Sequence, residues 1–220
     1  MLEPITLLAT ILICVSAYAD NFAPPSWAGR PLSYHAEWAF GSSGDLSNPD
    51  SESGGGPVNS EFLYDQFSTH IDYDGPGWVW DVADGDGGIT KPSGGSFGIN
   101  TINWVDELPL KYVRVQLTYT GPAPDVPHAQ GYSFDLYHGG GGATTTDHGL
   151  FASDPPVFVD ANHAYWDITM IPNPDWEQIV VNVPQGTIID QIVVDTISIP
   201  EPSTMTALAM DACFVLRRRR

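Results

Sequence analysis

Apolar and polar residues alternate along several short stretches in the middle of the chain. The clearest is Tyr112–Tyr119, in which the odd-numbered positions are apolar and the even-numbered ones are mostly polar. Tyr34–Phe40 repeats the pattern, with its even-numbered positions apolar or aromatic. Alternation with a period of two residues is typical of a β-strand that buries one face. Both stretches are therefore predicted to be strands that line a core.

Further strands are predicted where short apolar runs are bounded by turn residues, and no long segment of the body shows a helical period. These strands are expected at residues 78–82, 97–105, 132–137, 157–159, 164–171, 179–183 and 188–199. Loops rich in glycine or proline are expected at residues 41–57, 84–95, 121–130 and 139–142. Residues 62–73 fit either a pair of strands or a short helix. Many short strands joined by turns predict an all-β fold, an antiparallel β-sandwich or jelly roll.

The end of the chain combines three features in a fixed order. Pro200-Glu201-Pro202 is followed by the apolar run Ser203–Leu216, and the chain closes with four arginines, Arg217, Arg218, Arg219 and Arg220. An apolar segment followed at once by clustered arginines is typical of a stop-transfer signal, because the positive residues stay on the cytoplasmic side. The arrangement resembles the PEP-CTERM sorting signal of exported bacterial proteins. That resemblance implies an exosortase-type processing protease as a partner, which recognises and removes the tail.

The apolar run of this tail is short for a membrane anchor. A helix that spans a bilayer needs about 20 apolar residues, whereas Ser203–Leu216 contains 14 and includes Asp211. An aspartate near mid-span costs about 2.5–3.5 kcal/mol on insertion scales. The tail is therefore expected to form a short apolar helix that anchors the protein only transiently. The alternative is an ordinary C-terminus with a chance basic cluster.

The N-terminus also predicts export. Ile5–Val15 is an apolar stretch of the length expected for a signal-peptide core, and Ala17 and Ala19 fit the small-x-small cleavage rule. Cleavage there makes Asp20 the first mature residue. We therefore divide the chain into a signal peptide with an N-terminal helix (1–19), a β-sandwich domain (20–198) and a sorting signal (199–220). The expected location is the cell surface, outer membrane or extracellular matrix, after transient anchoring in the inner membrane.

Removal of both ends makes the protein more acidic. The body keeps four of the eight basic residues and 25 of the 27 acidic ones, so the formal net charge moves from −19 to −21. Such a body repels nucleic-acid phosphates and anionic membranes, so no nucleic-acid partner is expected. Cys14 and Cys213 are the only cysteines, and both lie in the segments expected to be lost. The mature body is then without disulfides, and its stability must come from its core.

Three carboxylates lie close together on a glycine loop. Asp81, Asp84 and Asp86 fall within six residues, among glycines. Calcium prefers six to eight hard oxygen ligands on flexible backbone, which acidic glycine loops supply. The spacing does not match an EF-hand. The loop is therefore a candidate for a structural calcium site, the one cofactor considered, and a solvated acidic turn is the competing interpretation.

The chain contains seven tryptophans, all between the two terminal segments. Most tryptophans of a β-sandwich belong to the core, because each buries a large area. This is expected for most of Trp38, Trp78, Trp80, Trp104 and Trp166. Trp27 and Trp176 lie in predicted loops instead, so they are the candidate exposed pair that stacks on a sugar ring.

Catalysis finds little support in the sequence. Residues 94–98 read Gly-Gly-Ser-Phe-Gly, which matches the hydrolase G-x-S-x-G pattern. That pattern needs a strand before the serine and a helix after it, whereas a loop precedes and a strand follows here. The six histidines are scattered, and no carboxylate pair stands out for a glycosidase. The protein is therefore predicted not to be an enzyme.

The last part of the body carries a second resemblance. Residues 176–184 and 186–196 look like the closing strands of jelly-roll modules, including carbohydrate-binding modules. The resemblance implies a jelly roll and an extracellular polysaccharide as the partner. We expect an exported, non-catalytic protein that contacts carbohydrate or serves a structural role in the matrix. The alternative is a secreted polysaccharide hydrolase on the same scaffold.

Overall fold

The computed structural model describes residues 21–54, 69–82, 87–102, 108–135, 144–174 and 176–199. The signal peptide with its cleavage site, the sorting tail and the helices expected in both lie outside these residues. Among the described residues, no helix is long and apolar enough to cross a membrane.

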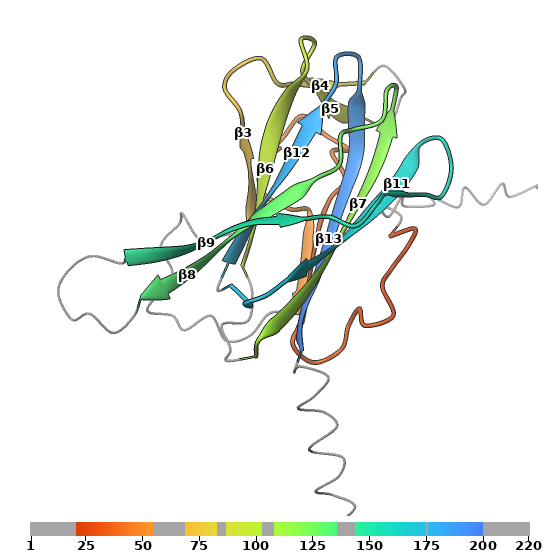
Figure 1. Ribbon diagram of the computed structural model, residues 1–220. Helices are drawn as coiled ribbons and strands as arrows, with labels where there is room; N and C mark the ends of the chain where they lie inside the picture. The colour runs from red at the N-terminus through yellow and green to blue at the C-terminus, as the bar shows by residue number, and fades with distance from the viewer. Residues whose placement is uncertain are drawn as a thin grey trace, which may run out of the picture.

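Two antiparallel sheets pack face to face as a sandwich (Figure 1). Sheet A has the order β10 (Val157–Phe158), β11 (His163–Met170), β7 (Leu110–Thr120), β13 (Ile188–Ile199), β1 (Ser33–Trp38) and β2 (Ser51–Gly54). Beside this path, β5 (Gly88–Thr90) pairs with β13, and β4 (Val79–Asp81) pairs with β5. Sheet B has the order β3 (His70–Tyr73), β6 (Gly95–Ile102), β12 (Trp176–Val183), β8 (His128–Asp135) and β9 (Thr144–Ala152). The all-β sandwich predicted from the alternating pattern is confirmed.

The core lies between the sheets and is built from the predicted apolar faces. Trp38 of β1 and Trp166 of β11 are its largest members, with at most 1% of their surface exposed. The apolar positions predicted for the strand around Val115 are all buried. Sheet B contributes Phe97, Ile99, Ile179 and Val181, which are equally buried. Burial of one face of β1, β7, β11 and β12 explains why the period of two residues is so clear in the sequence.

The last two strands form the middle of the two sheets. β12 pairs with β6 and β8 in sheet B, and β13 pairs with β7 and β1 in sheet A. A turn at residues 184–187 carries the chain from one sheet to the other. The two segments predicted as the closing strands are therefore strands, but they belong to different sheets.

Three short or polar strands lie outside the predicted strands. β2 falls within predicted loop 41–57, β5 falls within predicted loop 84–95, and β9 lies in a stretch for which no element is predicted. All four residues of β2 are exposed, and β9 runs along the free edge of sheet B. An edge strand buries little side-chain surface, so it leaves no apolar pattern in the sequence. β5 was missed because it contains only three residues.

A buried ion pair joins the two sheets. The Lys111 ammonium on β7 lies 3.0 Å from a Glu177 carboxylate oxygen on β12, and both side chains are 0% exposed. Lys111 Nζ also donates a hydrogen bond to the Pro174 carbonyl oxygen at 2.7 Å. Thr101 Oγ1 donates to the second Glu177 oxygen at 2.6 Å. A polar contact between the sheets thus lies in the core, and the hydrophobic pattern gives no sign of it.

Candidate functional site

The outer face of sheet B carries rows of polar and aromatic side chains. The central row runs through successive strand partners His70, Asn100, Gln178, Gln130 and Leu150. Because partners in an antiparallel sheet point to the same side, their side chains line up across all five strands. We call this surface the amide face; it comprises His70, Asp72, Asn100, Gln130, Tyr132, Asp147, Trp176 and Gln178.

Hydrogen bonds between neighbours fix the side chains of the amide face. Asn100 Nδ2 donates to an Asp72 carboxylate oxygen at 2.8 Å and lies 3.3 Å from His70 Nε2. Gln178 Nε2 donates to the Asn100 amide oxygen at 3.3 Å. On the other side of the row, Gln130 Nε2 donates to Asp147 at 2.9 Å. The amide groups are held in one orientation before any ligand arrives.

Gly98 of β6 leaves space for the Gln178 side chain to pack against the sheet. A Cβ atom at this position would come within 2.9 Å of Gln178 Nε2 and within 3.0 Å of its Cδ. The absence of a side chain therefore creates the room that Gln178 occupies above β6. Any larger residue at position 98 would displace the Gln178 side chain.

Two aromatic rings stand at one end of the amide face. Tyr132 and Trp176 are strand partners, and their rings stack with centroids 4.2 Å apart and planes 17° from parallel. Both residues are half-buried. Burial raises the pKa of the Tyr132 hydroxyl, and the negative charge of Asp147 adds to the effect. The phenol is therefore a neutral group that can both donate and accept a hydrogen bond.

None of the lysines and arginines of residues 21–199 belongs to the amide face. Lys111 is buried between the sheets, and Arg114 lies on the outer face of sheet A. Lys91 Nζ donates to the Asp74 carbonyl oxygen in the turn after β3. Arg30 lies in the segment that precedes β1. The charged groups of the face are thus the carboxylates Asp72 and Asp147, with His70 beside the first.

The outer face of sheet A presents a second polar row. Ser53, His35, Asp195, Arg114 and Asp167 are successive partners across β2, β1, β13, β7 and β11. A serine, a histidine and an aspartate in line invite comparison with a hydrolytic triad, in which histidine acts as the base. Whether the row could work that way depends on what each histidine nitrogen faces.

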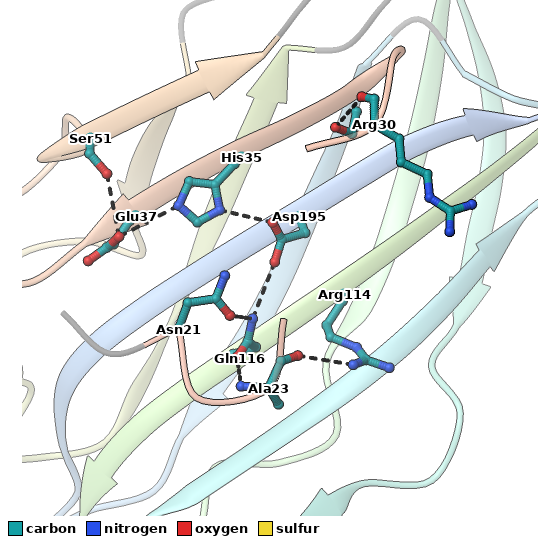
Figure 2. Close-up of polar contacts among 10 residues, drawn as sticks. Asn21, Ala23, Arg30, His35, Glu37, Ser51, Arg114, Gln116 and Asp195 are labelled. Atoms are coloured by element: carbon teal, nitrogen blue, oxygen red, sulfur yellow. Dashed lines mark hydrogen bonds and ion pairs between the residues drawn. The ribbon is translucent and has the colours of Figure 1, made fainter. Parts of the chain in front are cut away.

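His35 lies between two carboxylates (Figure 2). Its Nδ1 is 2.9 Å from Asp195 Oδ1, and its Nε2 is 3.6 Å from Glu37 Oε2. The hydrogen bond to Asp195 is the main reason that the pKa of His35 is raised, against the opposing effect of burial. Such a histidine favours the protonated, ion-paired form. Because Nε2 faces Glu37, the geometry is that of a charge cluster rather than of a general base aimed at Ser53.

The structure separates the two predicted sugar-stacking tryptophans. Trp176 is not in a loop but at the start of β12, where it forms part of the amide face. Trp27 lies in a turn of the segment that leads into β1 of sheet A. Of the tryptophans predicted for the core, Trp38 and Trp166 are fully buried and Trp78 packs partly against the core. Trp80 is half-buried and Trp104 lies outside the described residues.

The other predicted sites are placed only in part. Asp81 ends β4, whereas Asp84 and Asp86 lie outside the described residues, so the calcium site stays a prediction. Within the described ranges, no group of three or more metal-binding side chains comes together. Ser96 of the G-x-S-x-G pattern lies within strand β6. This placement agrees with the prediction that the pattern is not a nucleophile elbow.

Sequence reasoning missed the three amides of the amide face. Asn100 falls in the predicted strand 97–105, Gln130 in the predicted loop 121–130 and Gln178 just before the predicted strand 179–183, and nothing in the sequence marks them out. Only the pairing of β6, β12 and β8 makes them neighbours.

Comparison with known proteins gives distant likenesses in fold only. No family model and no curated protein sequence matches the chain, so the likeness of the tail to a sorting signal stays a prediction. One similar structure is the module TmCBM61 in complex with beta-1,4-galactotriose: 12% identity, 59% of this chain and 91% of that chain covered, and a TM-score of 0.24. Another is the enzymatically active domain of bacteriophage CBA120 tailspike protein 4: 8% identity, 76% of this chain and 19% of that chain covered, and a TM-score of 0.26. At these scores, neither structure bears on the ligand of this chain.

Proposed function

We propose that the protein is an exported, non-catalytic module that contacts carbohydrate through its amide face. The observation that supports this is the pair of amides Gln178 and Gln130, held in place by the buried Asn100 and by Asp147, beside the stacked rings of Tyr132 and Trp176. A side-chain amide offers both donors and an acceptor, as a sugar hydroxyl does. Aromatic rings supply an apolar surface with a polar end, which suits the face of a sugar ring.

The extent and charge of the amide face support a neutral glycan chain. Neighbouring strands are about 4.8 Å apart, so five strands span about 19 Å, which exceeds the width of one sugar ring. The face carries Asp72 and Asp147 and has neither lysine nor arginine. Like charges repel, so a polyuronate or a phosphorylated glycan is disfavoured.

Export and sorting complete the proposal. The apolar segment and small residues before Asp20 support cleavage by a signal peptidase. The Pro-Glu-Pro triplet, apolar run and terminal arginines support recognition by an exosortase-type protease. The body would then reach the cell surface or extracellular matrix, where polysaccharide is at hand.

The test is retention of the protein on insoluble polysaccharides. The panel contains neutral, uronate and amino polysaccharides, and each is tested with calcium and with EDTA. Gln178→Ala should lose retention, because it removes the central amide of the row. Gln185→Ala is the matched control, since this glutamine is exposed in the turn after β12. Release of soluble sugar is measured in the same samples.

The outcomes separate the competing functions. Retention on a neutral polysaccharide that Gln178→Ala abolishes and Gln185→Ala preserves would support the proposal. Loss of this retention in EDTA would add support for the structural calcium site. Release of sugar would favour the hydrolase. Passage through every matrix would overturn carbohydrate contact and leave a structural matrix protein.

A further inference from the structure

The first described residues lie across the outer face of sheet A. Ala23 is held through both of its backbone groups (Figure 2). Its N–H donates to Gln116 Oε1 at 2.9 Å, and its carbonyl oxygen accepts from Arg114 Nη1 at 3.0 Å. Asn21 Oδ1 accepts from Gln116 Nε2 at 2.6 Å. The ring of Phe22 meets the ring of His163 edge-on, with centroids 4.9 Å apart.

The side chains that hold this segment are themselves fixed by the sheet. Arg114 Nε and Nη2 each donate to the Asp167 carboxylate at 2.7 Å, and the guanidinium lies 4.1 Å from the centroid of the Tyr165 ring. Gln116 Nε2 also donates to Asp195 at 3.2 Å, and Gln116 and Asp195 are each only 1% exposed. A site whose groups are already oriented loses little entropy when it binds.

These contacts define a peptide-binding site of stated chemistry. Arg114 and Gln116 recognise the carbonyl and the N–H of a single residue, and the same glutamine recognises an amide side chain two residues earlier. β7 and its neighbours are already paired on both sides, so the segment does not join the sheet as a strand. The segment is therefore bound by the side chains of Arg114 and Gln116 and not by the backbone of an edge strand. The ligand of this site is a short peptide with the sequence Asn-Phe-Ala.

We propose that this site also binds the Asn21–Ala23 segment of a second copy and so joins copies of the protein into chains. Predicted cleavage before Asp20 would release the segment from the signal peptide, so that only a few residues have to leave one site and enter another. The nine residues 24–32 can reach up to about 30 Å when extended, which is enough to meet a neighbour. An exchanged segment makes the same contacts in the second copy as in its own. Retention at a surface raises the local concentration and favours exchange.

The experiment uses the full chain with a specific protease site inserted between Ala19 and Asp20. Mass is measured by light scattering during size-exclusion chromatography, over a range of concentrations, before and after cleavage. The expected result is a single copy before cleavage and concentration-dependent assemblies of two or more copies after it. An excess of a synthetic peptide that covers residues 20–25 should return the assemblies to single copies.

Two variants test the route of exchange. Ala23→Pro removes the backbone N–H that donates to Gln116, and position 23 lies outside both sheets. The cleaved variant should therefore stay a single copy. Ser26→Ala is the control substitution in the same part of the chain. Gln116→Leu keeps the segment and removes the receptor, and its folding is checked by near-ultraviolet circular dichroism. Each variant alone should be single, and a mixture of the two should form one-to-one pairs. A cleaved wild-type chain that stays single at every concentration, or a mixture without pairs, would overturn the proposal.

Discussion

The buried ion pair between the sheets gives the sharpest test of how this core is stabilised. Lys111→Met removes the ammonium and leaves the Glu177 carboxylate, which is 0% exposed, without this cation. The hydrogen bond from Thr101 stays in place. Removal of one partner of a buried pair costs about 3–5 kcal/mol, because the other charge stays away from water. For a domain of this size, each kcal/mol shifts the melting temperature by about 2–4 °C, so a fall of about 6–20 °C is expected.

The double variant decides whether the cost comes from the stranded charge. Lys111→Met with Glu177→Leu removes both charges and fills the space with apolar atoms. It leaves the Pro174 carbonyl and the Thr101 hydroxyl without these partners, which costs about 1–3 kcal/mol for each group. The Pro174 carbonyl loses Lys111 in both variants, so only the Thr101 hydroxyl is newly affected. The double variant should therefore be more stable than Lys111→Met by the cost of the stranded charge, less about 1–3 kcal/mol for that hydroxyl.

Urea unfolding followed by tryptophan fluorescence measures all of these variants. The slope of the unfolding free energy with urea should stay constant, because the buried surface hardly changes. Two results would refute the reasoning. One is a loss below about 1 kcal/mol for Lys111→Met, which would mean that water or another group solvates the carboxylate. The other is a double variant that is no more stable than Lys111→Met.

Three further predictions concern the faces and turns of the sandwich. Hydrogen bonding to Asp195 raises the pKa of His35 above its usual 6.5, so its stabilising effect is complete below about pH 6.5 and is lost as pH rises through the higher folded value. Unfolding free energy should therefore fall as pH rises above about 6.5, and a His35→Gln variant that keeps the same slope would contradict this. Gly98→Ala should displace the Gln178 side chain and reduce retention on polysaccharide, while the melting temperature changes little. Unchanged retention would show that Gln178 is not part of the binding site. Gly121→Ala should lower the free energy of unfolding by more than the roughly 1–2 kcal/mol of a left-handed backbone alone. The φ of Gly121 is +97°, and an added Cβ would collide with a carbonyl oxygen of the neighbouring turn. Thermal unfolding measures the loss, and a smaller loss would show that the turn moves aside.

The long central strands could be predicted because the sandwich buries one face of each. The prediction for residues 188–199 matches the bounds of β13, and the buried face predicted for β1 is the one observed. β2 and β9 could not be predicted in the same way, because each runs along the free edge of a sheet and keeps polar residues. Trp176 was predicted to be exposed in a loop, but it lies half-buried at the start of β12, and its stacking on a sugar ring stays a prediction.

The fold class and the acidity of the surface follow from the sequence alone. Alternation with a period of two residues indicates strands with one apolar face, and the excess of acidic residues disfavours a polyanion as partner. Which polar residues lie together depends on how the strands pair. Asn100, Gln130 and Gln178 are far apart in the chain, and they become neighbours because β12 inserts between β6 and β8. Strand pairing depends on contacts between distant segments, so the amide face and the docked N-terminal segment exist only once the sheets have formed.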